Sequence, residues 1–189
     1  MSELFSIQLQ NRQQQGRDGI WLDLPTTTEQ VQAALRQIGI SSDNPQGLFI
    51  SGYFAEEEKR FAIPYNMVLA SNVDELNFLA SRLETLSTGE RAELNAALQA
   101  PQSELFSIGR ITDFPENVDY YVHLPDVHGP AQLGDYYLNR SGMVDMPEEW
   151  KGGIDTAQFG RYVAQQEQGA FTQYGYLVKS GDEWQKVHE

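Results

Sequence analysis

The chain has 189 residues, a net charge of −14 and no cysteine, and 40% of its residues are hydrophobic. This apolar content can build a folded core, and the length fits one domain or two to three small ones. The missing cysteines exclude disulfides, thiolate nucleophiles and zinc fingers. The acidic balance argues against direct binding to nucleic acid, which requires clustered Lys and Arg.

Residues 1–62 are predicted to form a small β-β-α-β module. Apolar residues alternate with polar ones over 5–10 and over 20–24, which is the pattern of two half-buried strands. The third predicted strand covers 48–54. The segment from Met1 to Gln15 is polar and lacks the apolar stretch of a signal peptide, and no apolar stretch is long enough to cross a membrane. We therefore expect a cytoplasmic protein.

Capping residues mark the starts of three helices, and apolar residues at helical spacing follow each of them. The first helix is predicted over 28–38, with Gly39 as the residue after its end. The second and third are separated by a turn of about two to three residues, which predicts a helical hairpin in a module of residues 63–101. The capping pairs are Thr26 with Glu29, Asn72 with Glu75, and Ser87 with Glu90.

Residues 102–189 are predicted to form a second small α+β module, with a helix at about 131–140. The hexamer Ser-Glu-Leu-Phe-Ser-Ile at 2–7 recurs at 103–108, and each copy is followed some 17 residues later by Leu-Pro. One explanation is a duplicated β-β-α-β module flanking the helical part. The other is a chance match, because the residues between these positions differ. The expected fold class is α+β, an elongated chain of three parts.

The acidic residues are unevenly distributed along the chain. Between Arg91 and Arg140 the only basic residue is Arg110, whereas seven acidic residues stand singly among apolar ones. A folded segment of this kind must display spaced negative charge, and self-repulsion makes that display costly. Solubility is one explanation, and imitation of a polyanion is another. The seven acids are Glu93, Glu104, Asp113, Glu116, Asp119, Asp126 and Asp135.

The sequence offers no recognisable catalytic site. Its only histidines are His123, His128 and His188, and Asp126 with His128 lacks a third metal ligand at suitable spacing. No serine-hydrolase elbow, phosphate-binding loop or dinucleotide fingerprint occurs. We therefore expect a binding protein, not an enzyme, with no cofactor.

Several motifs together resemble those of the ArdA-type antirestriction proteins. The most specific is the helix over 72–80, which is similar to the family's N-I-D-E-L-N-x-L-A. The matches run in order from residue 19 to residue 177. They are Gly19-Ile20-Trp21-Leu22-Asp23, Asn72-Val73-Asp74-Glu75-Leu76-Asn77-Phe78-Leu79-Ala80, Leu133-Gly134-Asp135-Tyr136-Tyr137-Leu138, Ile154-Asp155 with Phe159-Gly160-Arg161, and Gly169 to Tyr176.

The resemblance implies an elongated, curved and usually dimeric protein that mimics bent B-form DNA. Such a protein occupies the DNA groove of type I restriction–modification enzymes and lets an incoming mobile genetic element escape cleavage. The implied partner is thus a protein, without membrane or direct nucleic-acid binding. The candidate acidic surface comprises Asp74, Glu75, Glu84, Glu93, Asp113, Glu116, Asp119, Asp126, Asp135, Glu148 and Glu149. The candidate dimer interface comprises Tyr120, Tyr121, Tyr136 and Tyr137, since an acidic chain needs an uncharged interface.

Two positions depart from the family pattern. The third strand often ends in D-Y-E, whereas here it reads Gly52-Tyr53-Phe54 and the acids follow at 56–58. The family usually has E-E after the Tyr-Tyr helix, and here Asn139-Arg140 follows. These changes put potency and the choice of enzyme in doubt, and barely affect the expected fold. The competing hypothesis is an acidic adaptor that binds a cationic patch on a different kind of protein.

Overall fold

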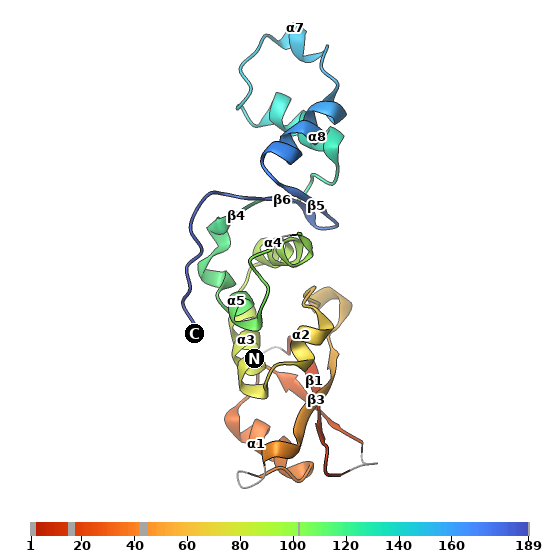
Figure 1. Cartoon of the computed structure of the whole chain (residues 1–189), viewed down its shortest axis with the longest axis vertical. Helices are drawn as coiled ribbons and strands as arrows, with labels where there is room; N and C mark the ends of the chain where they lie inside the picture. Colours follow the sequence, from red (N-terminus) through yellow and green to blue (C-terminus); the bar gives the residue numbers. More distant parts are fainter. Residues whose placement is uncertain (1–2, 15–17, 42–44, 102, 189) are drawn as a thin grey trace. The chain divides into compact units, whose positions relative to one another are not determined.

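The computed structural model describes residues 3–14, 18–41, 45–101 and 103–188, and Figure 1 shows it coloured along the sequence. Its internal contacts divide the chain into two compact units. The first unit comprises Met1–Ser87, Leu105–Pro115 and Lys186–Glu189, and the second comprises Thr88–Glu104 and Glu116–Gln185. The predicted α+β class is confirmed, and the division into three modules stays a prediction. None of the described helices has the length and apolar character needed to span a membrane.

The first unit is built on a three-stranded antiparallel sheet of order β2-β1-β3. These strands are β1 (Phe5–Asn11), β2 (Ile20–Leu24) and β3 (Leu48–Phe54), so the two strands predicted from alternation and the third predicted strand are confirmed. Alternate residues of β1 are buried, because successive side chains of a strand point to opposite faces. One face of the sheet therefore joins the core, and the other carries the polar residues of β1.

Helices α1 (Thr28–Gln37), α2 (Tyr65–Leu69) and α3 (Val73–Leu83) pack against the strands of this sheet, and α5 (Ile108–Thr112) packs against α3. The predicted capping box of α1 is wrong by one residue. Thr27 and Gln30 form it, because the Thr27 hydroxyl accepts from the Gln30 amide while the Gln30 side chain accepts from the Thr27 amide. Gly39 follows the helix with φ of 70°, a conformation that favours glycine, as predicted.

Helix α3 is the central helix of the first unit. Leu76, Leu79 and Leu83 are fully buried on one side of it, as their spacing predicts. The Asn72 side chain caps its start by accepting from the Glu75 amide at 2.9 Å. Asn77 holds the chain after β2 to the same helix, since its side chain bonds both the N–H and the C=O of Thr26.

The repeated hexamer adopts two different structures. In the first copy Phe5, Ser6 and Ile7 begin β1, Glu3 and Leu4 precede the strand, and Ser2 is outside the described residues. In the second copy no strand forms. Instead the Ser107 hydroxyl accepts from the Arg110 amide and caps α5, and Ile108 and Ile111 are buried on that helix. The duplicated β-β-α-β module is therefore wrong.

The second unit contains a three-stranded antiparallel sheet of order β4-β6-β5. Its strands are β4 (Tyr121–Leu124), β5 (Ala170–Thr172) and β6 (Gly175–Lys179). Val118–Tyr120 form a turn of 3-10 helix directly before β4, so apolar residues alternate from Val118 to Leu124 but the strand begins only at Tyr121. The helices are α4 (Thr88–Gln99), α6 (Pro130–Asp135), α7 (Glu148–Lys151) and α8 (Thr156–Gln166), and α6 continues as a π-helix over Tyr136–Arg140.

Helices α6 and α8 cross at two glycines. A Cβ on Gly160 would lie 1.8 Å from the Pro130 carbonyl oxygen, and one on Gly134 would lie 1.9 Å from the Thr156 oxygen. Only hydrogen fits at these positions, so the two backbones touch. This crossing holds Leu133 and Ala164 in a buried cluster with Tyr176.

We expect Gly160→Ala to destabilise the second unit by at least about 2 kcal/mol, because its methyl group has to force two backbones apart. The matched control is Gly89→Ala in α4, where nothing lies within 4 Å of an added Cβ. That change should stabilise slightly, by roughly 0.5–1 kcal/mol, through helix propensity. Urea denaturation measures both, and equal effects at the two positions would contradict the close crossing.

Candidate functional site

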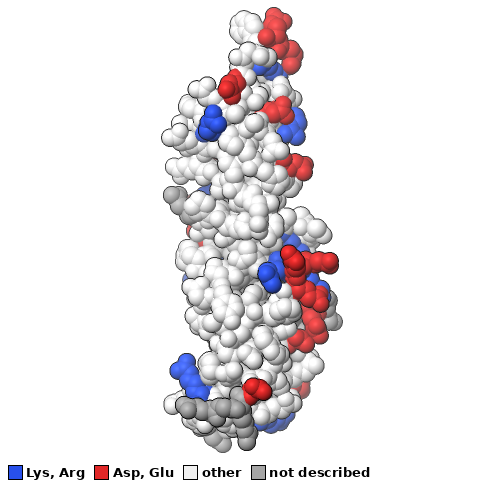
Figure 2. All heavy atoms as spheres, turned by 90° about the vertical axis from the view of Figure 1, so that its right-hand side faces the viewer, with Lys and Arg blue, Asp and Glu red and all other residues white. Residues whose placement is uncertain are grey.

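Negative charge is concentrated in the second unit. Its 87 residues include 14 acidic and 5 basic ones, a net charge of −9, whereas the 102 residues of the first unit carry 13 and 8, a net charge of −5. On the face drawn in Figure 2, acidic side chains gather in groups towards the margin, with Lys and Arg beside some of them. The exposure of each acid decides how much it contributes to a charged surface.

The segment from Glu116 to Asp135 in the second unit contains four acids and no Lys or Arg. Glu116, Asp119 and Asp126 are exposed, and Asp135 is half-buried. The backbone beside Glu116 and Asp119 is fixed by Asn117, whose buried side chain donates to the Gln185 carbonyl at 2.9 Å and accepts from the Gln185 amide at 2.7 Å. The acids on either side of Asn117 are therefore displayed on an ordered segment.

Other predicted surface acids are displayed on helices. Glu148 and Glu149 are exposed in the first turn of α7, and Glu148 pairs with Lys151 at 2.6 Å. In the first unit, Asp74 is exposed and Glu75 is half-buried in the first turn of α3, where the helix dipole favours carboxylates. Glu84 is half-buried at the other end of α3.

Asp113 is not a surface residue. It is only 1% exposed, and its Oδ1 accepts from the backbone N–H of His188 at 2.8 Å and lies 3.0 Å from His188 Nδ1. The ring of Phe78 lies against the same imidazole, with centroids 5.0 Å apart. The sequence could not reveal this burial, because the covering residue is 75 positions away.

Glu93 is half-buried in α4, and its Oε1 has no hydrogen-bond partner among the described residues. Burial, helped by the nearby charges of Glu90 and Asp119, raises the pKa of Glu93 from 4.5 to about 8. At neutral pH this carboxyl is mostly protonated. It therefore adds little to the negative surface.

Asp135 has both carboxylate oxygens engaged by the π-helix that follows it. Asn139 Nδ2 donates to Oδ1 at 2.8 Å, and Arg140 Nε lies 3.4 Å from Oδ2. The Arg140 guanidinium also lies over the Tyr136 ring, 5.6 Å from its centre. This places Arg140, a departure from the family pattern, directly on one of the predicted surface acids.

The four predicted interface tyrosines are not equally accessible. Tyr120 and Tyr121 are 8% and 6% exposed and pack edge-on against each other, so within this chain they belong to the interior. Tyr136 and Tyr137 are half-buried. The Tyr137 hydroxyl donates to Glu167 Oε2 at 2.8 Å, and the Tyr176 hydroxyl donates to Oε1 at 2.5 Å. Burial and these bonds raise the pKa of both tyrosines.

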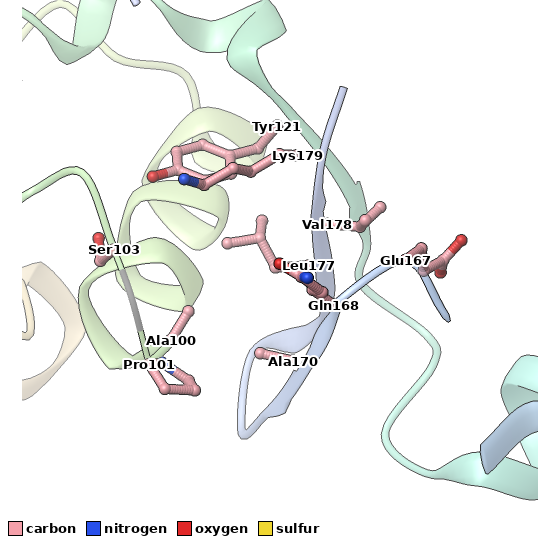
Figure 3. A pocket seen from close by; sticks show the side chains of 10 residues that line it. All are labelled: Ala100, Pro101, Ser103, Tyr121, Glu167, Gln168, Ala170, Leu177, Val178 and Lys179. Carbon is pink, nitrogen blue, oxygen red and sulfur yellow. The ribbon is translucent and has the colours of Figure 1, made fainter. Parts of the chain in front are cut away.

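Glu167, which we did not predict from sequence, thus joins α8 to β6 and to the π-helix. It also lines a small hollow of about 160 Å³ beside β6, together with Tyr121 and Lys179 (Figure 3). Lys179 is already paired with Glu104 at 2.9 Å. The charged groups of the hollow are therefore committed to internal bonds. Among the described residues no group of three His, Asp or Glu side chains could hold a metal ion.

Comparison with known families places this chain in one of them. A family model described as "Antirestriction protein (ArdA)" matches residues 15–178, which is most of the chain. The match includes every predicted surface acid and all four tyrosines. A comparison with curated proteins finds no match.

We expect Glu93→Gln to change the pH dependence of stability. The folded pKa lies above the unfolded value of 4.5, so the contribution of the protonated carboxyl is full below pH 4.5 and is lost as pH rises through about 8. The variant should equal the original chain at pH 4 and exceed it by about 1–2 kcal/mol at pH 8.5. Thermal unfolding from pH 4 to 9 measures this. The exposed Glu149→Gln is the control, and a pH-independent difference for Glu93→Gln would be the contrary result.

Proposed function

We propose that this chain, which belongs to the ArdA antirestriction protein family, inhibits type I restriction–modification enzymes by mimicking B-form DNA. In this mechanism its carboxylates take the places of phosphates and occupy the Lys- and Arg-lined groove in which the enzyme holds DNA. Incoming DNA then cannot bind, because the groove is already occupied. Family membership supports antirestriction, and the distribution of charge supports the mechanism.

The main observation in support of the mechanism is the segment from Glu116 to Asp135, which contains four acidic residues and no Lys or Arg. B-DNA presents one charge per about 1.7 Å of its axis, and a protein that binds it does so mainly through clustered cations. A mimic needs carboxylates that are displayed at the surface of a folded backbone. Glu116 and Asp119 are exposed beside Asn117, whose side chain fixes the backbone there, and Asp126 is exposed further along the same segment.

The burial data narrow the proposed acidic surface. Asp113 is interior and Glu93 is largely protonated at neutral pH, so neither contributes a steady surface charge. The homodimer remains part of the proposal, with Tyr136 and Tyr137 as the accessible members of the tyrosine set. The acids that remain are Asp74, Glu75, Glu84, Glu116, Asp119, Asp126, Asp135, Glu148 and Glu149.

Competition with DNA for a purified type I methyltransferase core tests the proposal. The chain should displace labelled DNA, and the logarithm of its affinity should fall with the logarithm of salt concentration. DNA releases condensed counterions, with a slope near −0.9 per neutralised phosphate. The chain is less densely charged, so its slope should be negative and shallower. Binding to the core without displacement of DNA would instead favour the acidic adaptor.

Replacing Arg140 should strengthen inhibition. Arg140→Ala removes the cation that covers Asp135 and restores a surface carboxylate, so we expect inhibition about two- to fivefold more potent at low salt. Arg161→Ala, at an exposed position on α8, changes the net charge equally and is the matched control. Dose–response curves for both variants provide the measurement. If the two improve potency equally, net charge alone matters and the Arg140 contact does not.

A further inference from the structure

The uncovered face of the β2-β1-β3 sheet carries two large exposed aromatic rings. Trp21 on β2 is 49% exposed, and Phe54 at the end of β3 is 55% exposed. The strand register puts both on the face opposite the core. Trp21 and Gly52 stand beside Gln8, while Asp23 and Phe54 stand beside Ser6. Within the described part of the chain neither ring stacks on another ring or on a cation.

Gly52 gives Trp21 its place on this face. A Cβ on Gly52 would lie 3.0 Å from Cη2 of Trp21 and 3.1 Å from Cβ of Gln8. The indole therefore reaches across β1 towards β3, over the position that has no side chain. Gly52 is itself buried. In the row of Trp21, Gln8 and Gly52 the indole ring therefore takes the place of a side chain on β3.

Acidic residues border the two rings. Asp23 is exposed on the same face, and its Oδ1 accepts from the Ser6 hydroxyl at 2.6 Å, which fixes the carboxylate beside the row of Phe54. A small hollow at the end of the sheet is lined by Phe54, Glu3 and Glu56. Lys59 also lines it and pairs with Glu56 at 3.2 Å. Glu57 and Glu58 follow as exposed acids, so negative charge dominates this border.

We propose that this aromatic face is a docking site for arginine side chains on a basic protein surface. A guanidinium can stack on an aromatic ring while its N–H groups pair with a carboxylate, and here both partners are within one face. Lysine fits less well, because its ammonium is a compact and strongly hydrated charge. The inference rests on the proposed function for the identity of the partner, a DNA-binding enzyme. The chemistry of the face is independent of it.

The first test uses peptides and needs no enzyme. Octa-arginine and octa-lysine are titrated into the full-length ¹⁵N-labelled chain, and the indole N–H signal of Trp21, assigned with Trp21→Phe, is followed. Octa-arginine should shift this signal at a concentration about three- to tenfold lower than octa-lysine does. Phe54→Ser and Asp23→Asn should each reduce that preference. Trp150→Phe, which removes an exposed tryptophan of the second unit, should leave it unchanged.

Three results would overturn the docking site. They are an unmoved Trp21 signal, equal responses to the two peptides, and an unchanged preference in both Phe54→Ser and Asp23→Asn. Sedimentation of Trp21→Ala adds a fourth outcome. If that variant dissociates a dimer, the face binds a second copy of this chain and the proposal is wrong. Circular dichroism confirms that each variant is folded, as expected for substitutions at exposed positions.

The second test uses the methyltransferase core and separates this inference from the proposed function. Phe54→Ser should weaken binding by a similar factor, about three- to tenfold, at every salt concentration, because stacking is less screened than surface charge. The salt slope itself should not change. If the enzyme does not bind the original chain and the peptide test is positive, the proposed function is wrong and the docking site is supported. If the enzyme binds tightly and the peptide test is negative, the docking site is wrong and the proposed function is supported.

Discussion

Electrostatic self-repulsion is the constraint on which the rest of this structure depends. The second unit holds a net charge of −9 on elements of 3 to 12 residues, so its short helices and strands must resist that repulsion through packing. The fold also decides which carboxylates keep their charge at the surface. Asp113 is buried against His188, and Glu104 and Glu148 are paired with lysines. The formal charge of −14 therefore overstates the negative charge at the surface, and the acids that stay exposed carry correspondingly more weight.

Buried polar groups supply the order that an acidic surface needs. Asn117 fixes the backbone beside Asp119 through two bonds to Gln185, and Asn77 fixes the end of β2 through two bonds to Thr26. Glu167 accepts from two tyrosine hydroxyls on different elements. Such groups are stabilising only when fully bonded, because an unsatisfied buried polar atom is costly. Each of them joins segments that are distant in the sequence, which sets where neighbouring acids point.

Sequence patterns predicted the helices and strands that are determined by residues close together in the sequence. The alternation in β1 and β2, the leucine stripe of α3 and the Gly39 terminus were all confirmed, because each depends on residues within one or two turns. The hexamer at 103–108 misled because identical residues adopt different structures in different surroundings. The interior positions of Asp113 and Tyr120 were missed for a related reason. Asp113 is covered by a segment 75 residues away, and the Tyr120 carbonyl accepts a bond from Ser180.

The two departures from the family pattern both change the balance between long-range electrostatic attraction and short-range contact. Arg140 covers an acid in the second unit, and Gly52 with Phe54 gives the first unit an aromatic face where the family often has two acids. Each change lowers the charge available for long-range attraction, which salt screens over about 8–10 Å. The aromatic face offers short-range contact in exchange, and such contact is less sensitive to salt. In the proposed mechanism the association rate therefore contributes less to the affinity, because electrostatic steering depends on charge. A slow dissociation rate contributes more, because dissociation depends on short-range contact. A chain of this composition should therefore favour partners whose grooves present arginine beside the phosphate-binding cations, and discriminate against grooves that offer lysine alone.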